Sequence, residues 1–170
     1  MNSPKSILTS IYFALFQSQI SYGLMAWGTA CNDLIEKIFL LQKSAVRIIS
    51  DAGFNDHTQP LFKKLSILNI RDVFKHQIAS FMYDYDSGNL PTIFDSFFKR
   101  VNESHEYNTR SASLGKLAFS KTNTVTYGGS MLKSLGVKIF NDIKDLDILS
   151  KSKNKYDFSK KFKNFLITYY

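Results

Sequence analysis

Apolar residues recur at helical spacing along most of the chain. The first run of them predicts a helix over residues 4–28, bent near Gly23, where the missing Cβ weakens the helical preference. A second helix is expected to begin with Asn32 as its N-cap and to end at Gly53. Spacings of four and three residues alternate along its expected apolar stripe, which consists of Leu34, Ile38, Leu41, Ala45 and Ile48.

Shorter helical segments follow. Pro60 fits the first turn of a helix that ends near Lys64. Asn69 is the expected cap of a longer amphipathic helix, which closes at the turn formed by residues 87–89. Pro91 then opens one further brief helix.

Residues 102–130 change character, because 15 of these 29 residues are Ser, Thr, Asn or Gly. One interpretation pairs residues 117–119 with residues 124–127 as a small β-hairpin. Helices are expected to resume over residues 130–135 and 137–143, and a tail helix follows Asp157 as its cap.

The predicted fold class is therefore mostly α: a helical bundle, a loop-rich segment with a candidate hairpin, and a C-terminal helix. We expect a helical region over residues 1–100, a polar segment over 101–130, and a helical region over 131–170 that packs on the first.

Composition places the chain among ordinary globular proteins. Of its 170 residues, 44% are hydrophobic and 21% are charged, and Cys31 is the single cysteine. One cysteine excludes a disulfide framework and a thiolate zinc cluster. No apolar run approaches the roughly 18 residues that a membrane span requires. We expect a soluble intracellular domain without membrane contact.

Positive charge gathers in the last third of the sequence. The formal net charge is +8, and residues 105–170 hold 12 basic and five acidic side chains. Such an excess is typical of proteins that bind polyanions, and it equally fits a lysine-rich tail that keeps the protein in solution.

No catalytic constellation emerges from the motifs. Gly128-Gly129 lacks the residues of a phosphate loop, and the three histidines are too dispersed for a metal site, so we expect no cofactor. The alternating acids of Tyr83-Asp84-Tyr85-Asp86 lie at a helix end and point to different sides, which predicts solvated charges rather than two-metal chemistry.

Two groups of residues are candidates for nucleic-acid binding. Gln42, Lys43 and Arg47 lie off the predicted stripe, where Lys43 and Arg47 are one turn apart and suited to successive phosphates. Tyr107 and Arg110 could stack on a base and hold a phosphate. The alternatives are an ordinary polar helix face for the first group and a loop anchor for the second.

Several motifs, in order, resemble the thumb and post-thumb region of jockey-type non-LTR retrotransposon reverse transcriptases. The residues that carry the resemblance are the run 12–24 with Trp27-Gly28, the run Leu41-Gln42-Lys43-Ser44-Ala45-Val46-Arg47, Thr58–Phe62, His105-x-Tyr107-x-Thr109-Arg110, Gly136-Val137-Lys138-Ile139-Phe140-Asn141, and the Phe-rich basic helix 158–166.

The resemblance implies a non-catalytic piece of an RNA-directed DNA polymerase, because the palm and its metal-binding carboxylates are missing from this sequence. It adds Lys138, Lys160, Lys161 and Lys163 to the expected contacts with a nucleic-acid backbone, which would be weak and non-specific. The competing interpretations are a structural or protein-interaction module, a non-functional element relic, and an unrelated helical domain that binds DNA sequence-specifically.

A palm domain or a second copy is a further expected partner, through an apolar patch on the first helix. The candidate patch residues are Tyr12, Phe16, Tyr22 and Trp27.

Overall fold

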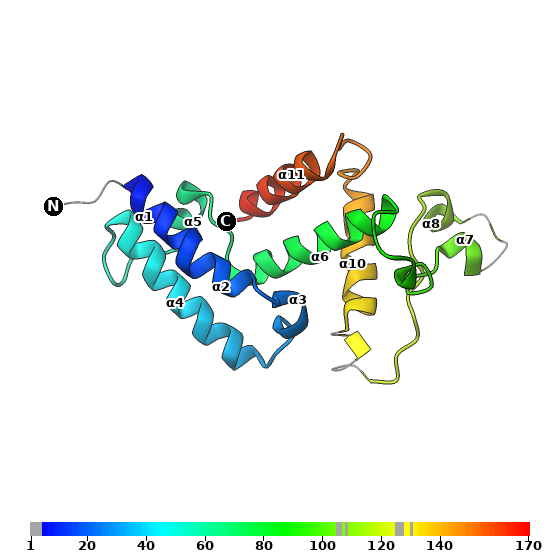
Figure 1. The fold of residues 1–170 in the computed structure, drawn as a ribbon, viewed down its shortest axis with the longest axis horizontal. Helices are drawn as coiled ribbons and strands as arrows, with labels where there is room; N and C mark the ends of the chain where they lie inside the picture. The colour runs from blue at the N-terminus through cyan, green and yellow to red at the C-terminus, as the bar shows by residue number, and fades with distance from the viewer. Residues whose placement is uncertain (1–4, 105–106, 108, 125–127, 130) are drawn as a thin grey trace. The chain divides into compact units, whose positions relative to one another are not determined.

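A computed structural model describes residues 5–104, 107, 109–124, 128–129 and 131–170. The fold is mostly α, as predicted, and the described residues contain helices and one isolated β-bridge. The chain divides into two compact units (Figure 1). The N-terminal unit holds residues 5–74 and 163–170, and the second unit is Lys75–Phe162. This division cuts across the three regions expected from the sequence.

The N-terminal unit is built from short helices beside one long helix. Its elements are α1 (Lys5–Ile11), the π-helix η1 (Tyr12–Gln17), α2 (Ser18–Ser21), α3 (Leu24–Trp27), α4 (Asn32–Ser50), α5 (Gln59–Leu65), the start of α6 (Ile70–Asp86) and the end of α11 (Lys155–Thr168). The expected interruption at Gly23 is confirmed, because its φ of 62° lies in the left-handed region that favours glycine. The N-cap of α4 is Cys31, one residue before the predicted Asn32, and the helix stops at Ser50, before Gly53.

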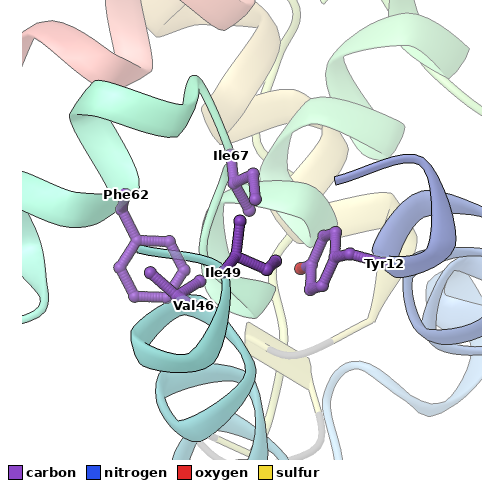
Figure 2. Close-up of a cluster of buried hydrophobic side chains, with 5 residues drawn as sticks. All are labelled: Tyr12, Val46, Ile49, Phe62 and Ile67. Carbon is purple, nitrogen blue, oxygen red and sulfur yellow. The ribbon is translucent and has the colours of Figure 1, made fainter. Parts of the chain in front are cut away.

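The core of the N-terminal unit joins helices that are distant in sequence. Figure 2 shows the Tyr12 ring of η1 facing Ile49 of α4, with Val46, Phe62 and Ile67 completing the cluster. Each of these side chains is buried. Removing their apolar surface from water is the main force that fixes α4 against η1 and α5.

The structure corrects the predicted apolar stripe of α4. The buried positions are Ile35, Gln42, Val46 and Ile49. Three of the five predicted stripe residues lie toward solvent instead, because Leu34 is 53%, Leu41 63% and Ile48 70% exposed. The other two, Ile38 and Ala45, are half-buried, and Ala45 packs against the core cluster. The apolar residues of α4 span more of its circumference than one packed face. The other helices of the unit cover the side that carries Ile35, Val46 and Ile49.

The predicted cap of α6 is confirmed. The side-chain oxygen of Asn69 accepts from the Asp72 backbone N–H at 3.0 Å, and its amide nitrogen donates to the Asp72 carboxylate at 2.7 Å. The Tyr170 hydroxyl also donates to that carboxylate at 2.6 Å and accepts from the Asn69 backbone N–H at 3.0 Å. Residues about a hundred positions apart thus meet at the start of α6.

The second unit packs aromatic side chains around the remainder of α6. Its other elements are η2 (Thr92–Phe94), α7 (Val101–Ser104), α8 (Arg110–Ser113), α10 (Leu132–Asp145) and the start of α11. Met82, Phe140 and Phe158 are completely buried. Asn141 of α10 fixes the backbone of Leu117. Its side-chain amide accepts from the Leu117 N–H at 2.9 Å and donates to the Leu117 carbonyl at 3.0 Å.

Two predictions in this unit need correction, and the predicted hairpin stays a prediction. Leu117 forms an isolated β-bridge with Arg100, and residues 125–127 of the predicted hairpin lie outside the described residues. The expected helices over 130–135 and 137–143 are one helix, α10, which continues through Gly136. The tail helix begins at Lys155, before Asp157, and the Asn154 side chain accepts from the Asp157 N–H at 2.8 Å.

The apolar patch expected on the first helix is only partly present. Tyr12 is 4% exposed and belongs to the core, and Phe16 packs against the same cluster. Trp27 is half-buried, whereas Tyr22 is 85% exposed. Among the described residues, no helix has the length and apolar character needed to cross a bilayer.

Candidate nucleic-acid interface

Gln42, predicted to contact a nucleic-acid backbone, is completely buried. Its amide nitrogen donates to the Tyr12 hydroxyl at 2.7 Å and to the Leu68 carbonyl at 2.9 Å. Its amide oxygen accepts from the backbone N–H of Ile70 at 2.9 Å. Both N–H groups of the Gln42 amide and its oxygen are thus hydrogen-bonded to buried groups of the protein. The prediction for Gln42 is therefore wrong, and its role is structural.

Lys43 and Arg47 lie on the half-buried edge of α4 and already have partners. The Lys43 ammonium is 3.9 Å from the Glu36 carboxylate and 4.2 Å from the centre of the Phe39 ring. The Arg47 guanidinium donates to the Asp56 carbonyl through two nitrogens, at 3.2 and 3.0 Å. An exposed ion pair contributes little, about 0–1 kcal/mol, so the contact with Glu36 weakens Lys43 as a candidate without removing it. The Arg47 guanidinium is partly held by its two hydrogen bonds to a backbone carbonyl.

The lysines of α11 differ in availability. Lys161 donates to the Asp157 carboxylate at 2.7 Å and to the Lys151 carbonyl, and the hydrogen bond from Lys161 lowers the pKa of Asp157. Lys163 is half-buried above the Phe13 ring, and its burial lowers its own pKa. Lys160 is exposed, and no described carboxylate pairs with it. Of the three α11 candidates, Lys160 is therefore the one whose ammonium is most available to a phosphate.

An aromatic residue that the sequence did not single out lies one turn from Lys160. Tyr156 is 77% exposed on the first turn of α11. Lys153, at the entry to the helix, is also exposed. Its backbone N–H donates to the Asp157 carboxylate at 3.1 Å, whereas its ammonium forms no ion pair within 4 Å among the described residues. We call Lys153, Tyr156 and Lys160 the α11 entry cluster. Tyr156 and Lys160 are four residues apart, a spacing that places them on the same helix face.

The remaining candidates are exposed but separate from that cluster in the chain. Lys138 lies on the solvent side of α10 without a carboxylate partner among the described residues. Tyr107 is 79% exposed, and Arg110 is the first residue of α8. Thr109 caps α8 by accepting from the Ala112 N–H at 3.3 Å. His105, of the same motif, lies outside the described residues.

The acids of the Tyr83–Asp86 segment are engaged rather than solvated, which corrects the prediction. The Asp84 carboxylate is 2.5 Å from the Lys155 ammonium. The Asp86 carboxylate forms ion pairs with the Arg100 guanidinium at 2.9 Å and with the Lys144 ammonium at 3.2 Å. A pocket of about 360 Å³ has Asp86, Lys144 and Asp147 as its charged lining residues, and of these Asp86 and Lys144 form an ion pair with each other. Across the part of the chain that the structure describes, no three His, Cys, Asp or Glu residues gather as metal ligands would.

Comparison with known proteins returned no match. No protein-family model, no curated protein and no solved structure is similar to this chain.

Proposed function

We propose that this chain binds the sugar-phosphate backbone of nucleic acid, weakly and without sequence preference. We also propose that it does not catalyse polymerisation. The observation that carries the proposal is the α11 entry cluster, in which the exposed Tyr156 stands between two exposed lysines in the chain, neither of whose ammonium groups is in an ion pair with a described carboxylate. The resemblance to the thumb region of jockey-type reverse transcriptases supports the same function, because a thumb grips a template and its primer mainly through phosphates.

The chemistry of the cluster favours an unpaired strand. Lysine ammonium groups act as point charges toward phosphates, and each neutralised phosphate releases a condensed counterion. An exposed aromatic ring offers a surface on which any base can stack, at about 1–3 kcal/mol per base. A cluster that offers two cations and one exposed ring therefore favours single-stranded nucleic acid over a duplex, whose bases are already stacked.

Salt dependence is the direct test. Fluorescence anisotropy with a labelled oligothymidylate at several salt concentrations should give a linear plot of log K against log [salt]. Each lysine contact should contribute a slope of about −0.7 on a single strand. The double variant Lys153→Glu/Lys160→Glu should weaken binding and flatten the slope by about 1.4.

A matched control separates this local effect from net charge. Lys64 and Lys99 are also exposed and without a carboxylate partner among the described residues. Lys64→Glu/Lys99→Glu changes the net charge by the same amount, yet should leave most of the binding intact. Equal losses in both double variants would mean that diffuse charge, and not the α11 entry cluster, attracts the nucleic acid. Binding that ignores salt would refute the proposal.

Two further measurements distinguish the competing functions. Tyr156→Ala should reduce binding to a single strand more than binding to a duplex, because it removes stacking and no charge. Competition between unrelated sequences should show no preference, since a strong preference would favour a sequence-specific helical domain. Nucleotide incorporation by the isolated chain in a primer-extension assay would overturn the non-catalytic part of the proposal.

A further inference from the structure

The apolar row of α4 that the fold leaves uncovered has the spacing of a helix-pairing seam. Leu34, Leu41 and Ile48 are each more than half exposed and recur every seven residues. Ile38 and Ala45 lie between them and are half-buried. Heptad recurrence with alternating four- and three-residue steps is the pattern by which two helices interlock side chains. We call these five residues the α4 seam.

Charged residues along one edge of the α4 seam complement each other. Lys37 and Ser44 lie seven residues apart on the solvent edge of α4, and Asp51, the C-cap residue in the left-handed region, follows Ser44 after another seven. All three are exposed. Neither Lys37 nor Asp51 has an ion-pair partner among the described residues. The other edge is unavailable, because Ile35 and Ile49 pack into the core of the same unit. A partner helix therefore meets positive charge at one end of this edge, negative charge at the other, and a hydroxyl in the middle.

We propose that two copies of this chain pair antiparallel through their α4 seams, about a two-fold axis near Ser44. In that arrangement Lys37 of each copy faces Asp51 of the other, and both ion pairs have favourable sign. A parallel arrangement would set Lys37 against the partner's buried edge, where no acid is available. The surface is thus self-complementary in the sense that a two-fold interface requires.

Pairing of the two α4 seams loses little conformational entropy. α4 is already folded by the packing of Val46, Ile49 and their neighbours, so pairing does not have to create the helix. The seam from Leu34 to Ile48 is only about 21 Å long, given a rise of 1.5 Å per residue. Its short length predicts a reversible dimer that forms in the micromolar range rather than an obligate one.

Sedimentation equilibrium of the full chain over a wide concentration range tests the proposal. The wild type should shift from monomer to dimer, and Leu41→Glu should weaken the dimer at least about 100-fold, because two carboxylates enter the seam near the axis. Ile93→Glu is the matched control, since Ile93 is 74% exposed in the second unit. Circular dichroism verifies that each variant stays helical.

The first helix is the alternative surface, and it is distinguished by its own variant. Leu15 is 70% exposed on η1. A dimer that Leu15→Glu abolishes and Leu41→Glu leaves intact would overturn the proposal. A chain that remains monomeric at every concentration would overturn it as well.

Chemical cross-linking tests the antiparallel register. In a Cys31→Ser background, Ser44→Cys should be cross-linked efficiently by a short bis-maleimide, because the two thiols meet near the axis. Lys37→Cys should not be cross-linked, since the two thiols then lie about 21 Å apart along the helices, fourteen residues at 1.5 Å each. The reverse pattern would contradict the antiparallel arrangement. Neither outcome depends on nucleic-acid binding, so this proposal and the proposed function fail separately.

Discussion

Replacing Gln42 with leucine is the most informative perturbation of the N-terminal unit. The Gln42 amide is the hydrogen-bonding partner of the Leu68 carbonyl and of the Ile70 N–H, both next to the start of α6. Leucine has nearly the same size but neither donates nor accepts. Each buried backbone group left without a partner costs about 1–3 kcal/mol, so the two together cost about 2–6 kcal/mol.

Part of that loss is offset by the new side chain. Full burial of a leucine stabilises by about 1.5–3 kcal/mol relative to exposure. The mid-range values, a loss of about 4 kcal/mol and a gain of about 2 kcal/mol, leave a net loss of about 2 kcal/mol. The Tyr12 hydroxyl adds little to the loss, because it keeps its hydrogen bond to the Gln17 side chain at 3.0 Å. A domain of this size is stable by only about 5–15 kcal/mol, so the effect is large enough to measure.

Urea denaturation followed by tryptophan fluorescence provides the assay. Trp27 is the only tryptophan and lies in the N-terminal unit, so its signal reports on that unit. Lys43→Leu is the control, because the neighbouring lysine is half-exposed and should change the free energy of unfolding by less than about 1 kcal/mol. An unchanged or increased stability of Gln42→Leu would refute the structural role of Gln42.

Three further predictions concern stability. Gly28→Ala should destabilise by about 1–3 kcal/mol in the same urea assay, because a Cβ there would lie less than 3.0 Å from the Phe74 ring. Tyr170→Phe should cost about 1–3 kcal/mol by thermal unfolding, since the largely buried Asp72 carboxylate loses its hydroxyl donor. Burial raises the pKa of Tyr12 from 10.0 to about 12, so the folded state favours the neutral phenol. Its stabilisation should be complete below pH 10 and should fall by about 1.4 kcal/mol per pH unit between pH 10 and 12, as urea titrations at several pH values would detect.

Local signals in the sequence predicted most helix positions well. Asn69 with Asp72 three residues later is a self-contained cap, because its hydrogen bonds join neighbouring residues. The break at Gly23 likewise follows from the backbone freedom of one residue. Helix ends defined by competing side chains were less predictable. The Asn154 side chain caps α11 by accepting from the Asp157 N–H, so the helix begins three residues earlier than it would with Asp157 as its cap.

Helical periodicity predicted the exposure of the candidate interface residues less well than it predicted the helices. Two of the predicted α10 and α11 lysines, Lys138 and Lys160, are exposed as expected, whereas Lys161 and Lys163 are engaged within the fold. Tyr156 escaped notice because an isolated aromatic residue carries no periodic signal. Its exposure depends on which face of α11 packs.

Helical content, the order of the helices and the excess of positive charge follow directly from the order of residues, because hydrogen bonding within a helix and formal charge are local properties. The choice of buried face on α4 is not local. Its apolar arc is wide enough for either Leu41 or Gln42 to point inward, and Gln42 is buried because Tyr12, Leu68 and Ile70 supply partners for its amide. Those partners come from segments about 26 to 30 residues away, and only the folded chain brings them together.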